Sequence, residues 1–281
     1  MIDKRIINKD AVLYVERADI ALQHIKDSSI QCCVTSPPYW GQRIYNGTEG
    51  CLGLEPTQKE YIENLVFVLD MVGKCLKNDG VLWLNLGDGH YTKTSTNRNG
   101  ATNLGGNKVR GGGEYALPVR SDPHIKEKEL CGTPWAVAFA LRECGFYVRD
   151  AIIWQKPSPM PGGAADRCVS SYETVFMLTK SKRYKFHREA MSEDAVGGGR
   201  RWMRNVWTIP SAKGNGWHFA RMPEELATRC ILGTTDAGET VLDPFSGSGT
   251  TGIVAVANGR KYVGIENDPA YAIASVESWE D

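Results

Sequence analysis

Short apolar runs alternate along the chain with longer stretches in which apolar residues recur every three or four positions. The apolar runs predict short buried strands over 12–15, 31–35, 81–86, 146–154, 240–242 and 261–265. The amphipathic stretches predict helices over 57–76, 133–144, 223 to about 233, 250–258 and 269–278. Strands that alternate with helices in this way indicate an α/β fold with a mostly parallel, Rossmann-like sheet covered by helices on both faces.

Two local signals add detail to this pattern. Thr133 followed by Pro134 is typical of an N-cap and a first helical residue. The runs 175–178 and 183–186 flank a Thr-Lys-Ser-Lys turn and predict a β-hairpin. The sequence shows no internal repeat, and we expect a single domain over residues 1–281.

Two segments interrupt the alternation of strands and helices. Residues 89–128 are polar and rich in glycine, which predicts a flexible insertion that is either functional or a plain surface loop. Residues 162–216 are the candidate target-recognition segment. They hold an Arg-Arg-Trp cluster, which suits phosphate contacts and base stacking but also fits a solvated loop. The candidate nucleic-acid contacts in the two segments are Lys108, Arg110, Arg200, Arg201, Trp202 and Arg204.

The composition narrows the classes of protein that fit. The 281 residues carry 33 basic and 33 acidic side chains, so bulk positive charge cannot supply affinity for a polyanion, although a local basic groove can. No apolar run approaches the roughly 18 residues of a membrane span, and the first residues lack the apolar core of a signal peptide. The eight cysteines form no C-x-x-C pair and the five histidines are scattered, which favours a reduced cytosolic protein with no metal site.

A glycine-rich turn follows the predicted strand 240–242. It begins with Asp243, contains Gly247 and Gly249, and leads into the predicted helix at Thr250. The glycines allow a ligand to approach the backbone closely, and the first turn of the helix offers backbone N–H groups to it. Glu266 ends the next strand 23 residues after Asp243, a separation that suits a carboxylate bound to ribose hydroxyls. With Gly252 the turn also matches the G-x-G-x-x-G pattern of dinucleotide enzymes, and a turn without any ligand is a further alternative.

An acidic residue at this turn favours a cationic ligand without phosphate, because a carboxylate repels a pyrophosphate. S-adenosylmethionine is such a ligand, since it joins an adenosine to a sulfonium and an amino acid. We therefore prefer it to a nicotinamide dinucleotide as the predicted cofactor.

A second turn, Ser36-Pro37-Pro38-Tyr39, lies at the end of the predicted strand 31–35. Its prolines fix the backbone direction, the Ser36 hydroxyl is an acceptor, and Tyr39 offers a flat face for stacking. Together these groups suit a planar ring with an exocyclic amine, such as a nucleobase extruded from a duplex. The alternative is a strand terminator with Tyr39 and Trp40 packed in the core.

These two motifs together resemble those of the DNA amino-methyltransferases. Ser36-Pro37-Pro38-Tyr39 resembles the catalytic motif and the turn 243–251 resembles the cofactor motif; their order resembles that of the beta subgroup. The segments 81–88, 153–161 and 217–224 resemble further motifs of the same family, so the resemblance covers most of the chain. The resemblance implies S-adenosyl-L-methionine as cofactor, with a site formed by Thr35, Phe219, Asp243, Pro244, Phe245, Gly247, Ser248, Gly249, Thr250, Glu266 and Asn267.

The resemblance also implies direct methyl transfer to an amine. Ser36 and the Pro37 carbonyl would accept hydrogens from the amine, Pro38 would complete the turn, and Tyr39 would stack on the flipped base. The Pro-Cys pair of carbon-methylating relatives is absent. Serine in the first position favours cytosine N4 over adenine N6. A catalytically silent nucleic-acid-binding module is the alternative from another class.

The partners and location follow from the same resemblance. It implies double-stranded DNA as substrate, a cognate restriction nuclease as partner, and the cytoplasm of a bacterial or phage-infected cell.

Overall fold

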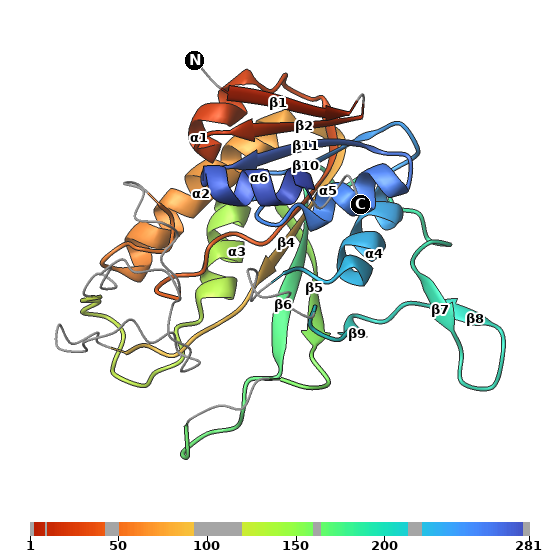
Figure 1. Ribbon diagram of the computed structural model, residues 1–281. Coiled ribbons are helices and arrows are strands. Elements are labelled where there is room, and N and C mark those ends of the chain that lie inside the picture. The colour runs from red at the N-terminus through yellow and green to blue at the C-terminus, as the bar shows by residue number, and fades with distance from the viewer. Residues whose placement is uncertain are drawn as a thin grey trace.

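The computed structural model describes residues 3–8, 10–42, 51–92, 120–159, 164–212 and 221–277. Within them a nine-stranded sheet has the order β1-β2-β11-β10-β3-β4-β6-β5-β9, and β7 and β8 form a separate pair (Figure 1). The strands are β1 (Asp3–Asn8), β2 (Ala11–Val15), β3 (Ile30–Thr35), β4 (Leu76–Leu86), β5 (Tyr147–Gln155), β6 (Tyr172–Thr179), β7 (Ser192–Asp194), β8 (Arg200–Trp202), β9 (Val206–Thr208), β10 (Thr240–Asp243) and β11 (Lys261–Glu266). The helices are α1 (Ala18–Ala21), the short 3₁₀ helix η1 (Leu22–His24), α2 (Gln58–Cys75), α3 (Thr133–Glu143), α4 (Glu224–Thr234), α5 (Thr250–Ala257) and α6 (Pro269–Glu277).

All strands of the large sheet except β1 and β6 run in one direction. Strands β2, β11, β10, β3 and β4 pair in parallel, β6 lies antiparallel between β4 and β5, and β9 extends the sheet in parallel to β5. The predicted α/β fold with a mostly parallel sheet is therefore confirmed. Because parallel strands share their carboxyl edge, the loops after β3, β4, β10 and β11 gather at one side of the sheet, where ligands of such folds bind.

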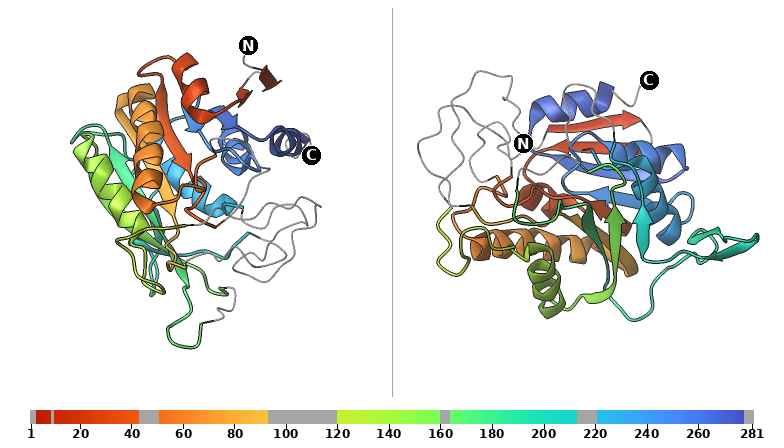
Figure 2. Two further views of the ribbon diagram at one scale, coloured as in Figure 1. Left: turned by 90° about the vertical axis from the view of Figure 1, so that its left-hand side faces the viewer. Right: turned by 90° about the horizontal axis from the view of Figure 1, so that it is seen from below.

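Alternate residues of the strands enter two hydrophobic cores, one on each face. Leu82, Leu84 and Leu86 of β4 face a core formed with α1, α2 and α3. Val81 and Trp83 face the other core, formed with α4 and α5. Figures 1 and 2 show these helices as layers on opposite sides of the sheet. No helix in the described part of the chain is both long and apolar enough to cross a membrane.

The two longest predicted helices form where the sequence indicates, with one change at a terminus. Helix α2 begins after Thr57, whose hydroxyl accepts from the Glu60 N–H while Glu60 accepts from the Thr57 N–H. Helix α3 begins one residue earlier than predicted, at Thr133 itself, so that Gly132 is the N-cap. The Asp88 carboxylate takes over the capping role, since it accepts from the N–H groups of both Gly132 and Thr133.

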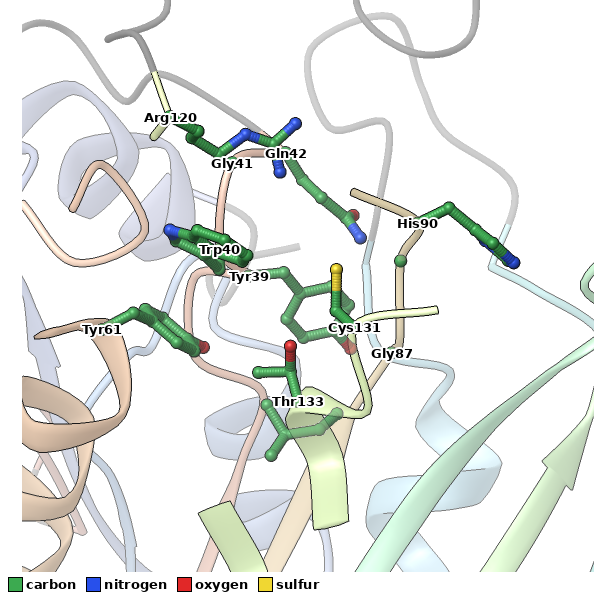
Figure 3. A pocket seen from close by; sticks show the side chains of 12 residues that line it. Tyr39, Trp40, Gly41, Gln42, Tyr61, Gly87, His90, Arg120, Cys131 and Thr133 are labelled. Carbon is green, nitrogen blue, oxygen red and sulfur yellow. The ribbon is translucent and has the colours of Figure 1, made fainter. Parts of the chain in front are cut away.

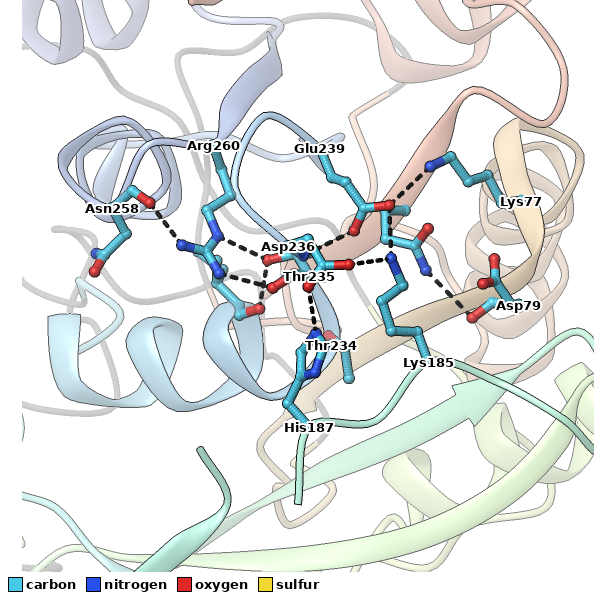
Figure 4. Close-up of polar contacts among 12 residues, drawn as sticks. Lys77, Asp79, Lys185, His187, Thr234, Thr235, Asp236, Glu239, Asn258 and Arg260 are labelled. Atoms are coloured by element: carbon cyan, nitrogen blue, oxygen red, sulfur yellow. Dashed lines mark hydrogen bonds and ion pairs between the residues drawn. The ribbon is translucent and has the colours of Figure 1, made fainter. Parts of the chain in front are cut away.

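The predicted hairpin over 175–178 and 183–186 is wrong. Strand β6 is hydrogen-bonded along both edges, to β4 and to β5, so no edge remains for a following strand. The chain instead crosses towards the loop between α4 and β10. There the Lys185 ammonium contacts Asp236 at 2.7 Å and Glu239 at 2.8 Å (Figure 4). The backbone N–H of His187 donates to the Gly233 carbonyl.

The two segments that interrupt the alternation of strands and helices differ in how much of each the structure describes. Residues 93–119, including Lys108 and Arg110, lie outside the described residues. At the ends of the glycine-rich segment, Tyr91 and Arg120 are buried. Residues 162–216 contribute β6 and β9 to the central sheet, in addition to the β7–β8 hairpin, so this range does not form a unit apart from the core.

Candidate active site

Five polar side chains from five strands meet at one side of the sheet. Ser36 follows β3, Asn85 is the penultimate residue of β4, and Asp243 and Glu266 end β10 and β11. Glu173 joins them from the amino end of β6, which reaches the same edge because β6 runs in the opposite direction. The sheet order therefore brings the two sequence motifs, which are about 200 residues apart, onto neighbouring strands β3 and β10.

Asp243 is buried, with 4% of its surface exposed, and its carboxylate is held by three donors. Oδ1 accepts from the Thr35 hydroxyl at 2.7 Å and from the Phe245 N–H at 3.1 Å, and Oδ2 accepts from the Thr251 hydroxyl at 2.8 Å. Burial raises the pKa of Asp243 to about 6, although the hydrogen bonds from Thr35 and Thr251 oppose the rise. Asp243 thus ties the cofactor turn to the strand that carries the catalytic turn.

The backbone of the glycine turn needs two left-handed residues. Gly247 has φ +51° and Gly249 has φ +75°, a conformation that side chains with a Cβ rarely adopt. Gly249 is the N-cap of α5 and supplies no capping side chain. The turn 243–250 contains neither lysine nor arginine, so its charged group is an acid and its remaining donors are backbone and hydroxyl groups.

Glu266 closes the other side of the turn. Its Oε2 accepts from the Gly247 N–H at 2.8 Å and its Oε1 accepts from the Asp268 N–H at 2.9 Å. Burial raises the pKa of Glu266 to about 7, against the opposing effect of these backbone hydrogen bonds. The neighbouring Asn267 donates its amide to the Cys51 sulfur at 3.6 Å. Two acidic groups therefore lie at the ends of adjacent strands, as the separation in the sequence predicts.

The catalytic turn is held by a connected set of polar groups. The Tyr39 hydroxyl donates to Glu173 Oε2 at 2.7 Å and lies 3.2 Å from the Ser36 hydroxyl. The Asn85 amide nitrogen lies 3.0 Å from the Tyr39 hydroxyl and 2.8 Å from Glu173 Oε2. The Lys156 ammonium pairs with the other oxygen of Glu173. Ser36 and Tyr39 are therefore in contact with each other and share partners that the sequence analysis did not name.

One carbonyl of this turn is already hydrogen-bonded within the protein. The Pro38 carbonyl accepts from the Tyr61 hydroxyl at 2.8 Å, so it is already occupied by a protein donor. Trp40 is buried and donates its indole N–H to the Glu55 carbonyl, which agrees with the alternative of a core role for this one residue. Tyr39 and Trp40 line a pocket together with Arg120, Cys131 and Thr133 (Figure 3).

Two thiols lie close behind the catalytic turn but are poor nucleophiles. Cys32 and Cys33 are fully buried in β3. Burial raises the pKa of Cys32 to about 12 and that of Cys33 well above its usual range. Both thiols are therefore protonated at neutral pH and serve to pack β3 within the sheet.

Sequence reasoning missed Asn85, Lys156 and Glu173. Asn85 offered a signal, because it is the polar residue in the otherwise apolar run 81–86. Lys156 lies within the segment 153–161, which resembles a family motif, but nothing in that segment assigned it to the site. Glu173 offered no signal, and only the antiparallel placement of β6 between β4 and β5 brings both residues to the site.

The predicted DNA-contacting arginines lie apart from this edge, on the β7–β8 hairpin. The base of the hairpin packs on α4: Met191 lies against Gly233, and Met203 contacts Arg229. Figures 1 and 2 show the hairpin extending from the body. Trp202 is half exposed.

The arginines of the hairpin already have partners within the protein. Arg200 donates to Ser192, and Arg201 donates to Glu193 at 2.9 Å. Arg204 lies 3.8 Å from the same Glu193 oxygen. The Arg188 guanidinium lies over the Trp202 ring at 3.8 Å.

Phe219, predicted near the cofactor, is outside the described residues.

The chain matches a family of DNA methylases and is similar in sequence to Type II methyltransferases. A family model described as DNA methylase, N6_N4_Mtase, matches residues 30–277. The chain is 41% identical over 274 residues to the Type II methyltransferase M.XycI of Xanthomonas campestris pv. cyanopsidis, and the match covers 97% of this chain and 88% of that protein. It is 42% identical over 268 residues to the Type II methyltransferase M.Cfr9I of Citrobacter freundii, with 95% and 86% covered.

Solved structures with the same fold include two DNA methylases. The PvuII DNA methyltransferase, described as cytosine-N4-specific, superposes with a TM-score of 0.72 at 22% identity, and the match covers 100% of this chain and 91% of that one. A putative DNA modification methylase of Thermus thermophilus, in complex with S-adenosyl-L-methionine, gives 0.63 at 23% identity, with 95% and 93% covered.

The structure is an α/β fold in which the Ser36 turn and the Asp243 turn meet at the carboxyl edge of one sheet. The extent of the family match and the identity to full-length relatives show that this chain belongs to the N6_N4_Mtase family of DNA methylases.

Proposed function

We propose that this protein transfers a methyl group from S-adenosyl-L-methionine to the exocyclic N4 amine of a cytosine flipped out of double-stranded DNA. The observation that carries the proposal is the joining of the two turns. Thr35 contacts Asp243 of the cofactor turn, and the next residue, Ser36, contacts Tyr39 of the catalytic turn. A methyl donor in the first turn and an amine in the second would therefore be neighbours.

The cofactor turn fits a cationic adenosine compound. Asp243 and Glu266 supply negative charge, Gly247 and Gly249 allow close approach, and Thr250 opens helix α5 with free backbone N–H groups. Glu266 is at the end of β11, where a carboxylate can accept from ribose hydroxyls. Asp243 acts by holding the turn, because its oxygens are already bonded to Thr35, Thr251 and Phe245. When bound, S-adenosylmethionine supplies an electrophilic methyl on sulfur.

The residues of the catalytic turn would position the amine. Ser36 and the Pro37 carbonyl would accept its two hydrogens, which turns the nitrogen lone pair out of the ring plane. The Tyr39 ring would stack on the base. Methylation then needs the lone pair in line with the methyl group, so positioning supplies most of the rate enhancement. No covalent enzyme intermediate is needed, which agrees with protonated Cys32 and Cys33.

Two observations favour cytosine N4 over adenine N6. Serine occupies the first position of the Ser-Pro-Pro-Tyr turn, and the solved PvuII enzyme with the same fold is described as cytosine-N4-specific. Adenine N6 is the second candidate, because its amine can undergo the same reaction. The Type II names of M.XycI and M.Cfr9I support a role beside a cognate restriction nuclease.

The test identifies the modified base directly. The protein is incubated with isotope-labelled S-adenosylmethionine and genomic DNA of mixed sequence, and the digested nucleosides are separated by mass. We expect labelled N4-methyldeoxycytidine, and none after substitution Ser36→Ala, with the cofactor affinity unchanged. Label in N6-methyldeoxyadenosine would overturn the choice of base, and label in neither would overturn amino-methylation.

A further inference from the structure

A chain of hydrogen bonds leads from the Ser36 hydroxyl away from the base site to a charged residue, and its direction can be deduced. The Tyr39 hydroxyl has one hydrogen, and it donates that hydrogen to Glu173 Oε2 at 2.7 Å. Tyr39 must then be the acceptor in its 3.2 Å contact with Ser36, so Ser36 donates its own hydrogen to Tyr39. The Ser36 oxygen then acts as an acceptor towards other groups: the Asn85 amide nitrogen lies 3.4 Å from it, and its other lone pair is left for a further donor.

The carboxylate that sets this direction is fixed on both oxygens. Glu173 Oε2 accepts from Asn85 at 2.8 Å as well as from Tyr39, and the Lys156 ammonium pairs with Oε1. The side chains of Glu173 and Lys156 are 15% and 21% exposed, so water competes little for either charge. A Cβ on Gly87 would lie 3.3 Å from Glu173 Cγ, which shows that the backbone of the β4 loop confines the acid.

We propose that Glu173 is a positioning residue: through Tyr39 it makes the Ser36 hydroxyl an acceptor towards the target amine, and Lys156 keeps the carboxylate in the orientation that does so. The proposal rests on the proposed methylation of an amine at this site. A Ser36 hydroxyl turned the other way would present its hydrogen to the nitrogen lone pair, and that lone pair must remain free to attack the methyl group.

The substitution Glu173→Gln reverses the chain. Lys156 attracts the amide oxygen, so the amide NH₂ faces Tyr39; Tyr39 then donates to Ser36, and Ser36 turns its hydrogen towards the base. We expect the single-turnover rate of methyl transfer to fall by about 100-fold, the usual effect of losing one preorganised hydrogen bond at a reacting group. Cofactor affinity, measured by calorimetry, should stay within about twofold of wild type.

Removing the Lys156 ammonium tests the direction of the hydrogen bonds between Ser36 and residue 173, separately from any effect on folding. In the Glu173→Gln background, Lys156→Met lets the amide turn its oxygen to Tyr39, and we expect about a tenfold recovery of the rate. A role of Glu173 in packing alone predicts that the second substitution adds to the damage. Glu143→Gln, on the exposed face of α3, is the matched control and should leave the rate unchanged.

A second variant covers the case in which Glu173→Gln does not fold, as judged by circular dichroism. Tyr39→Phe keeps the aromatic face but removes the hydroxyl that links Ser36 to Glu173, so we expect about a tenfold lower rate of methyl transfer. Adding Glu173→Gln to Tyr39→Phe should then lower the rate by no more than about a further twofold. If the wild-type enzyme methylates the amine and either folded Glu173→Gln or Tyr39→Phe does so at the full rate, the role of Glu173 is overturned. The proposed function then still stands. A wild type that methylates no amine overturns both.

Discussion

Thr35 and Asp243 are 208 positions apart in the chain, and a 2.7 Å hydrogen bond joins the hydroxyl of one to the carboxylate of the other. This bond connects the ends of β3 and β10 within the buried part of the site. Register explains the meeting, because Cys33 pairs with Leu242 and places the following residues side by side.

Thr35→Val should lower the stability of the protein. The substitution keeps the shape of the side chain but leaves the buried Asp243 with one donor fewer, and such a loss costs about 1–3 kcal/mol. Urea unfolding would measure the change in free energy. Thr35→Ser, which keeps the hydroxyl, is the matched control and should lose much less. Equal stability of the valine and serine variants would show that the bond contributes nothing.

The raised pKa of Asp243 predicts how stability depends on pH. The folded protein binds this proton with a pKa of about 6, whereas an aspartate in an unfolded chain has a pKa of about 3.9. Asp243 therefore adds most to the free energy of unfolding below about pH 4. This stabilisation is lost as the pH rises through about 6, a change of about 3 kcal/mol. Asp243→Asn should remove this component, as measured by unfolding at about pH 4 and about pH 7. The same pH dependence in both proteins would exclude Asp243 as its source.

Glu266 should make cofactor affinity depend on pH. A carboxylate accepts hydrogen bonds and attracts a cation only when ionised, and burial raises the pKa of Glu266 to about 7. We expect the dissociation constant of S-adenosylmethionine to rise as the pH falls below about 7, by at most about tenfold per pH unit. Glu266→Gln should bind more weakly at about pH 8 and lose this dependence. Calorimetry would measure both, and a flat profile for the wild-type protein would remove Glu266 from the cofactor site.

The sequence predicted those parts of the site that consist of short continuous motifs. The Ser36 turn and the Asp243 turn each follow an apolar strand, and a parallel sheet places such ends at one edge, so their meeting could be anticipated. The position of β6 could not, because its apolar run fits a hairpin as well as a strand between two others. Glu173, which accepts from Tyr39, and Lys156, which pairs with Glu173, depend on this position and therefore emerged from the structure.

Gly87→Ala should disturb the catalytic turn directly. A Cβ at this position would lie 2.8 Å from Tyr39 Cε2, closer than real contacts allow, so the Tyr39 ring must move. We expect a methyl-transfer rate at least about tenfold lower, since small displacements of a positioning group are costly. Gly89→Ala is the control, because its nearest neighbour is the Gln42 amide at 3.8 Å. Equal rates for the two variants would mean that the position of Tyr39 is unimportant for the reaction.

The hairpin arginines give a prediction about DNA. Replacing Arg200 and Arg201 together by alanine should weaken binding at low salt and reduce the slope of log affinity against log salt by up to about 1.8, the value for two phosphate contacts. The ion pair of Arg201 with Glu193 limits the effect, because that arginine must leave its partner to reach a phosphate. Arg142→Ala, on the exposed face of α3, is the control. Fluorescence anisotropy over a salt series would measure both variants, and a slope equal to that of the wild type would place the hairpin outside the DNA path.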